Sequence, residues 1–149
     1  MAVLRTSART LAQVAGVFLV ACTPLALADS DAKEMRVVYH MDDARSGRFA
    51  LHIAEDQLKT NANMKIAVVA YGGGVDFLLK GARDKDDVPY EPAIQELISR
   101  GVQFRACSAT LGFRDIHKDR VVEGIDFVPA GTYEVIRLQA EEDYAYLKP

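Results

Sequence analysis

The chain has 149 residues, of which 50% are hydrophobic and 26% are charged; this composition is typical of a globular protein, and the length suits one domain. The formal net charge is −3, and because Arg5 and Arg9 are the only charged residues among the first 28, the rest of the chain carries −5. An acidic chain without tryptophan lacks the basic face that nucleic-acid binding requires, so we expect no nucleic-acid partner.

The first 28 residues have the pattern of a secretory signal peptide. Two arginines precede an apolar run over 11–22, which is too short to span a bilayer, and Ala26-Leu27-Ala28 has the small-x-small pattern of a cleavage site. We therefore expect cleavage after Ala28, export to the periplasm and one domain over 33–149. Leu19-Val20-Ala21-Cys22 supports an alternative, because it resembles a bacterial lipobox; the mature protein would then be acylated on Cys22 and held at the membrane.

Cleavage after Ala28 leaves Cys107 as the sole cysteine of the mature chain. No internal disulfide is then possible. A free thiol in an oxidising compartment is a liability unless the thiol is buried or used.

Apolar periodicity predicts strands that alternate with helices. The first strand covers 35–40 and ends at His40, and Ser46 is placed to cap a helix whose apolar residues recur over 50–58. The second strand, over 64–71, is a continuous apolar run, which indicates burial on both faces as in parallel sheets. Gly72-Gly73-Gly74 follows this strand at once.

A short helix over 75–80 and a charged surface loop over 81–88 come next. Pro89 and Pro92 open a third helix, and Gly101 ends it, since glycine adopts the left-handed conformation just past a helix end at little cost. The third strand, over 102–107, alternates apolar with polar residues until it reaches Cys107.

The remainder of the chain predicts one more helix between two strands. We expect irregular helical turns over 111–123 and a fourth strand over 125–129. Thr132 is placed to cap a last helix that runs to about Glu142, and a short strand over 144–147 follows.

Strands that alternate with helices predict an α/β domain with a mainly parallel sheet of four to five strands, covered on both faces. In such sheets the ligand crevice lies at the carboxyl ends of the strands, where the strand order reverses. If the order is 2-1-3-4, the first and third strands are neighbours, and His40 and Cys107 face one crevice.

Cys107 has two interpretations. At a strand end before a helical turn, its sulfur lies near unpaired amide donors and a helix dipole, both of which favour the thiolate; Ser108 is placed to cap that turn. Free cysteines are also common as small core residues, so the same position is compatible with a purely structural role. An imidazolium at His40 would lower the pKa of a nearby thiol, although His40 can equally serve a loop hydrogen bond.

The glycine triplet Gly72-Gly73-Gly74 can form a nest of amides for a small anion or simply a tight turn. It lacks the spacing of dinucleotide-binding and P-loop motifs, so we expect no nucleotide or other cofactor. One cysteine with scattered histidines offers no zinc site, and the acidic loop residues match no calcium loop, so we expect no metal.

The pattern of the whole chain resembles the DsrE/DsrF-like family. The similarity is carried by His40 at a strand end, by the segments 68–79 and 101–107, by Thr110-Leu111 and by the closing segment 144–149. The resemblance implies a three-layer α/β/α fold and a homo-oligomer, commonly a trimer or hexamer. It also implies a role in sulfur trafficking, in which the cysteine after a central strand, Cys107 here, accepts sulfane sulfur as a persulfide.

The expected function is therefore that of an exported sulfur-trafficking protein and possible sulfurtransferase. The Cys107 thiolate takes sulfur from a donor protein or small thiol and passes it to an acceptor, and the persulfide rests near the amides of Ser108 to Thr110, with His40 and the Gly72–Gly74 backbone in support. The alternative is a non-catalytic oligomeric module that binds a small anion or a partner protein in the same crevice.

Overall fold

The computed structural model describes residues 34–149, which belong to one compact unit. The predicted signal peptide and the alternative lipid site at Cys22 lie outside the described residues. Among the described residues, no helix has both the length and the apolar character needed to cross a bilayer.

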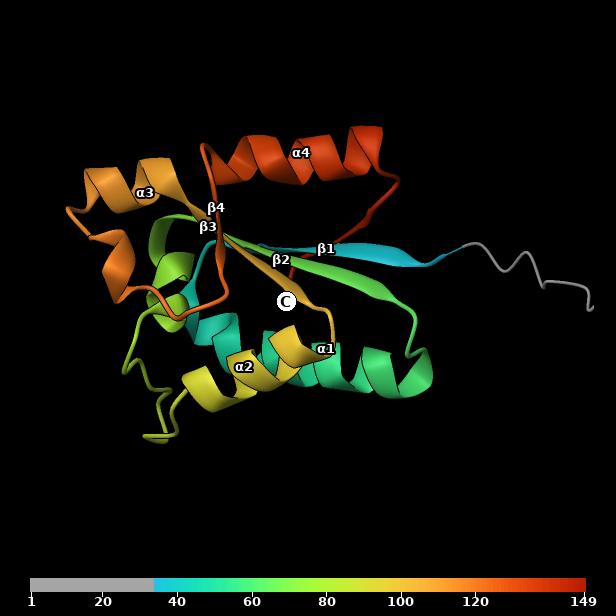
Figure 1. Cartoon of the computed structure of the whole chain (residues 1–149), viewed down its shortest axis with the longest axis horizontal. Helices are drawn as coiled ribbons and strands as arrows, with labels where there is room; N and C mark the ends of the chain where they lie inside the picture. Colours follow the sequence, from blue (N-terminus) through green and yellow to red (C-terminus); the bar gives the residue numbers. More distant parts are fainter. Residues whose placement is uncertain (1–33) are drawn as a thin grey trace, which may run out of the picture. The chain divides into compact units, whose positions relative to one another are not determined.

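A five-stranded, fully parallel sheet forms the centre of the fold (Figure 1). The strands are β1 (Arg36–Met41), β2 (Lys65–Ala70), β3 (Gln103–Cys107), β4 (Asp126–Val128) and β5 (Ala145–Leu147). The helices are α1 (Gly47–Thr60), α2 (Glu91–Ser99), α3 (Ser108–Phe113) and α4 (Gly131–Glu141), with 3-10 turns η1 (Ala44–Ser46), η2 (Gly72–Leu78) and η3 (Lys118–Arg120).

Helices cover both faces of the sheet, which gives the expected three layers. α1 and α2 lie on one face and α4 lies on the other (Figure 1). The larger core fills the α1 and α2 side, and a smaller core of Val38, Ala67 and Val69 packs against Val135 and Leu138 of α4. β2 supplies residues to both cores, which confirms that its continuous apolar run is buried on both faces.

The strand order is β4-β3-β2-β1-β5 and not 2-1-3-4, the order under which His40 and Cys107 would face one crevice. β2 lies between β1 and β3, and His40 and Cys107 are therefore two strands apart. Consecutive strands pair with one another from β1 to β4, as consecutive elements usually do, and the chain then crosses α4 to place β5 beside β1. The strand order therefore reverses at β1 and β5.

Several helix boundaries agree with the sequence patterns, whereas the expected caps do not. α2 begins with a proline in its first turn, and Gly101 follows its end with φ +89°. The capping residue of α3 is Cys107 itself rather than Ser108, and Ala130 rather than Thr132 precedes α4. Ser46 precedes α1 but makes no capping bond through its side chain.

Candidate functional site

The carboxyl ends of all strands meet at one end of the sheet, on the left in Figure 1. Side chains of a strand alternate between faces, and Val38 and Val69 pack on the α4 side. His40, two residues after Val38, and Tyr71, two after Val69, therefore lie on the α4 side as well. Arg105 contacts Glu134 of α4, so Cys107, two residues further along, also lies on that side.

Four side chains follow one another across this edge of the sheet. We call Tyr146, His40, Tyr71 and Cys107 the polar row. They come from β5, from β1, from the residue after β2 and from β3, in the order of the strands. One end of the polar row, His40 and Tyr146, lies where the strand order reverses. The other end of the row is Cys107.

The Cys107 sulfur accepts a hydrogen bond at the start of α3, where the backbone N–H of Thr110 donates to it at 3.4 Å. The Thr110 side chain and the backbone of Gly131 and Ala109 also act to lower its pKa, although the Ala109 amide itself donates to the Pro129 carbonyl at 3.1 Å. Burial acts to raise the pKa of Cys107, but these surrounding groups favour the thiolate and the net pKa lies below the usual value of a thiol. The site is therefore built to stabilise negative charge on sulfur.

Thr110 links this cysteine to the glycine triplet. The amide of Gly72 donates to the Thr110 hydroxyl oxygen at 3.0 Å, so the hydroxyl keeps its own proton for the sulfur. Gly72 has φ +55°, a conformation that favours glycine. The structure thus brings two predicted site residues, Gly72 and Thr110, to Cys107 through one hydrogen-bonded chain.

The other two glycines of the triplet pack closely against the end of β1. A Cβ on Gly74 would lie 2.2 Å from the Met41 carbonyl oxygen, and one on Gly73 would lie 3.2 Å from that of Asp42. The Gly74 amide donates to the Tyr71 carbonyl at 2.9 Å. The amides of Gly72 and Gly74 therefore donate to acceptors within the protein. The close packing against the end of β1 explains why residues without a side chain occupy these positions.

Access to Cys107 is narrow, since only 5% of the residue is exposed. Its predecessor Ala106 points into the larger core and is fully buried, whereas the Cys107 sulfur faces hydrogen-bond donors at the end of the sheet. Ser108, the first residue of α3, is half-buried beside it. Cys107 is therefore a free but buried thiol in this structure.

His40 does not contact Cys107 and is instead bonded on both sides by phenols. Its Nδ1 lies 2.6 Å from the Tyr146 hydroxyl, and its Nε2 pairs with the Tyr71 hydroxyl. Burial lowers the pKa of His40; Asp42 acts to raise it and Lys148 to lower it, and the net direction is downward. The imidazole is therefore neutral at pH 7, so one phenol donates to it and the other accepts from it.

Gly131 joins the two halves of the polar row. A Cβ on this first residue of α4 would lie 2.9 Å from Cβ of Tyr71 and 3.2 Å from Cβ of Cys107. Only glycine lets the start of α4 come this close, and the close approach brings the Gly131 amide to the sulfur. Neither Gly131 nor Tyr146 was predicted as a site residue, although a glycine directly before the expected helix was a usable signal.

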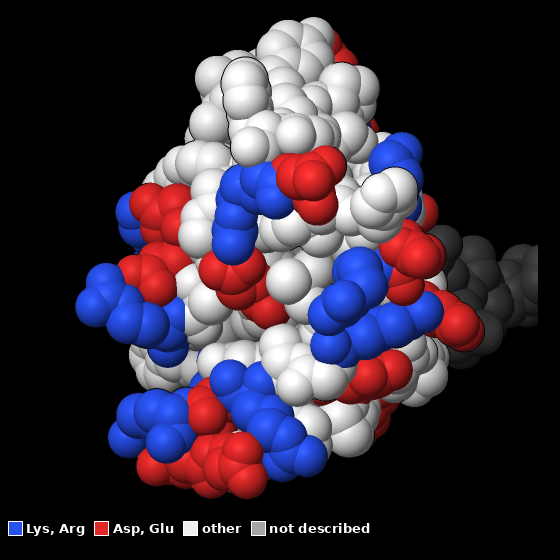
Figure 2. Space-filling view, turned by 90° about the vertical axis from the view of Figure 1, so that its left-hand side faces the viewer, with Lys and Arg blue, Asp and Glu red and all other residues white. Residues whose placement is uncertain are grey.

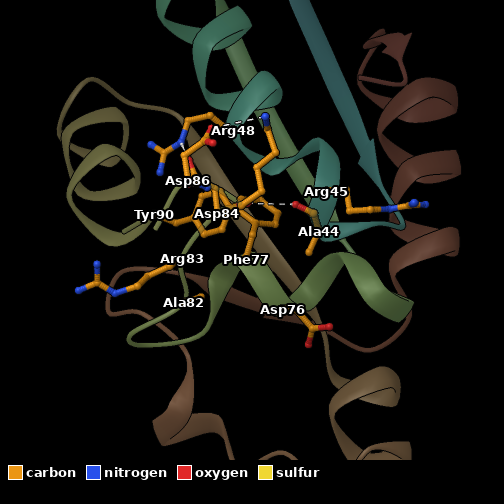
Figure 3. A pocket seen from close by; sticks show the side chains of 11 residues that line it. Ala44, Arg45, Arg48, Asp76, Phe77, Ala82, Arg83, Asp84, Asp86 and Tyr90 are labelled. Carbon is orange, nitrogen blue, oxygen red and sulfur yellow. Dashed lines mark hydrogen bonds and ion pairs between the residues drawn. The ribbon is translucent and has the colours of Figure 1, made fainter. Parts of the chain in front are cut away.

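A cavity of about 500 Å³ lies elsewhere, beside η1, α1 and the loop before α2 (Figure 3). Tyr90 and Phe77 form its apolar part, with their rings edge to face. Arg48 lies over the Tyr90 ring, and it bonds Asp84 and the carbonyls of Val88 and Pro89. The charged groups at its centre therefore bond to one another and hold the loop, and they do not converge on the cavity.

The face at the carboxyl ends of the strands carries basic and acidic side chains interspersed with uncharged ones, as Figure 2 shows. One ion pair there, Lys148 with Asp42 at 2.6 Å, lies beside the His40 end of the polar row. Across residues 34–149, no group of three or more His, Cys, Asp or Glu side chains is arranged to hold a metal ion.

The comparisons with known proteins agree with this architecture. A search of the curated proteins found no match. Among solved structures, a protein of unknown function from Methanobacterium thermoautotrophicum, MTH1491, is 32% identical with TM-score 0.68, over 78% of this chain and all of that one. The ychN protein from E. coli shares the fold, with TM-score 0.62 at 14% identity, over 77% of this chain and 99% of that one. The model of the DsrE/DsrF-like family matches residues 35–149, so the chain belongs to that family, which is related to sulfur relay.

Proposed function

We propose that this protein carries sulfane sulfur as a persulfide on Cys107 and passes it to an acceptor thiol. The observation that carries the proposal is the position of the Cys107 sulfur at the start of α3, where it accepts a hydrogen bond from the Thr110 amide and its pKa is lowered. A thiolate is the nucleophilic form of cysteine, and donors that stabilise it at neutral pH support this chemistry.

The transfer consists of two exchanges that balance without an external oxidant. The Cys107 thiolate attacks the outer sulfur of a donor persulfide R–S–SH; the donor S–S bond breaks, R–S⁻ leaves and Cys107–S–SH forms. An acceptor thiolate then attacks the outer sulfur of Cys107–S–SH, which releases the Cys107 thiolate. In the thiolate state the Thr110 amide donates to the sulfur that bears the charge.

Export and self-assembly belong to the same proposal. The signal-like first 28 residues support export to the periplasm, with acylation of Cys22 as the alternative. Large apolar side chains that are exposed on α3 and α4 support self-association; they are Phe113, Tyr133 and Ile136, of which Phe113 is 93% exposed. The trimer or hexamer is what the family resemblance implies. Donor and acceptor proteins or small thiols are the expected partners.

Intact mass spectrometry tests the proposal on the full chain expressed with export. Incubation with a low-molecular-weight persulfide is expected to add one sulfur atom, about 32 Da, to the native protein and none to Cys107→Ser. Addition of a free thiol should remove that mass. The same spectra report the mature N-terminus and any acyl chain, and native conditions report the assembly.

The second candidate function is that of a binding module without turnover, and the small exposed fraction of Cys107 is the observation in its favour. The two candidates differ in the reactivity of the folded protein. A native protein that gains no mass, and a thiol that is labelled only after denaturation, would support the binding module and contradict the persulfide carrier.

A further inference from the structure

His40 and Cys107 lie two strands apart, and the Tyr71 side chain fills the position between them. The hydroxyl of Tyr71 is bonded to His40, and its ring lies 5.0 Å from the imidazole between centroids. At the other end of the same side chain, Cβ and one ring carbon lie within 3.3 Å of the place where a Gly131 Cβ would stand. One side chain therefore contacts both the histidine and the start of α4.

His40 is itself held in place from the opposite side. The Tyr146 hydroxyl lies 2.6 Å from Nδ1, and the two rings meet edge to face at 5.6 Å. A neutral imidazole with a phenol on each nitrogen has both hydrogen-bonding positions filled, which fixes its ring orientation. The Tyr71 hydroxyl thus has a rigid partner.

The contact of Tyr71 with Gly131 affects the surroundings of the Cys107 sulfur. Gly131 packs against Cys107, since a Cβ on it would lie 3.2 Å from Cβ of Cys107, and its backbone is among the groups that lower the pKa of the thiol. The position of Gly131 depends on how closely the first turn of α4 approaches the sheet. The Tyr71 ring is the surface against which that turn rests. A ring free to rotate or shift would let the amide move away from the sulfur.

We propose that Tyr71, held by His40 and Tyr146, is a positioning residue for Cys107: its ring fixes the start of α4 so that the Gly131 amide stays directed at the sulfur. This inference rests on the proposed function only in requiring that Cys107 reacts as a thiolate. Alkylation of the thiol measures that property without any sulfur donor.

The test compares the rate of Cys107 alkylation by iodoacetamide against pH in the full chain. Tyr71→Phe and His40→Leu each remove the hydrogen bond between the two residues, and each is expected to slow alkylation at pH 7 about two- to fivefold and to move the midpoint of the pH profile upward. The double variant should be no slower than the slower single variant, because both changes remove the same contact.

Tyr90→Phe is the matched control, since the Tyr90 hydroxyl bonds the Ala44 carbonyl at 3.3 Å on the α1 side of the sheet. Circular dichroism confirms the folding of each variant, and alkylation in denaturant should be equal for all. A Tyr71→Phe profile that superimposes on those of the native protein and Tyr90→Phe would overturn the proposal, as would additive effects of Tyr71→Phe and His40→Leu. Normal alkylation without persulfide formation would instead overturn the proposed function and leave Tyr71 as a positioning residue.

Discussion

Glu134→Gln is expected to lower the free energy of unfolding by about 3 kcal/mol at pH 7, because it leaves the largely buried Arg105 guanidinium without a carboxylate partner, whereas Arg137 keeps Glu141 and Glu142. Glu134 is 7% exposed on α4 and accepts hydrogen bonds from Arg105 of β3 and from Arg137, the latter at 2.8 and 2.9 Å. This ion pair ties α4 to the sheet next to Cys107. Urea denaturation of the two proteins measures the difference.

The loss of stability in Glu134→Gln should become smaller as the pH falls. The hydrogen bonds from Arg137 hold the pKa of Glu134 below its ordinary value of 4.5, with burial opposing and Arg105 adding to the effect. A carboxylate with a lowered pKa in the folded state contributes stability above pH 4.5, and that contribution disappears as the pH falls through the folded-state value. The difference between native and Glu134→Gln proteins should therefore be constant from pH 7 to 5 and shrink in more acidic solution.

Glu141→Gln provides the control for Glu134→Gln. Glu141 lies on the same helix and faces the same Arg137 at 3.6 Å, but its side chain is 61% exposed. A solvent-exposed pair contributes little, so the change should stay within about 0.5 kcal/mol. Equal losses in the two variants would contradict the role given to the buried ion pair.

Gly131→Ala is expected to have two effects at once: it destabilises the protein by about 1–3 kcal/mol, and it raises the pKa of Cys107. The added Cβ would meet Cβ of Tyr71 at 2.9 Å and Cβ of Cys107 at 3.2 Å, and neither is the flexible end of a side chain. The start of α4 must therefore shift, and it takes the Gly131 amide away from the sulfur. Denaturation curves and alkylation rates against pH report the two effects.

Gly112→Ala is the matched substitution for Gly131→Ala. Gly112 lies in α3, and a Cβ there would meet nothing within 4 Å. Alanine is the better helix former, so this variant should be as stable as the native protein or more so, with unchanged alkylation. A Gly131→Ala protein that behaves like Gly112→Ala would show that the close packing at Gly131 does not control the thiol.

Local patterns predicted the elements of this fold well. The continuous apolar run of β2, the alternation before Cys107 and Gly101 after α2 all stand where they were expected, because each depends on contacts between residues close in the chain. The order of the strands in the sheet was not predictable, because an apolar strand suits any interior position of a parallel sheet. No residue in β1 indicates that β2 rather than β3 lies beside it.

The candidate site was predictable at the cysteine and less so around it. Cys107 and Thr110 are three residues apart, and their contact follows from the start of α3. The bond of His40 to Tyr146 spans 106 residues, and its bond to Tyr71 spans 31, so neither leaves a periodic signal in the sequence. Gly131 reaches the sulfur only because α4 crosses the sheet, which requires the tertiary structure.

Direct titration of the Cys107 thiol in the folded protein tests the central claim, that the site stabilises a thiolate. The absorbance of the thiolate near 240 nm, followed against pH with Cys107→Ser as the blank, gives the pKa without any sulfur donor. The hydrogen bonds to the sulfur predict a midpoint below that of the same cysteine in the denatured chain, and Thr110→Val, which removes one donor, should move it upward. A midpoint in the native protein equal to or above that of the denatured chain would contradict the account.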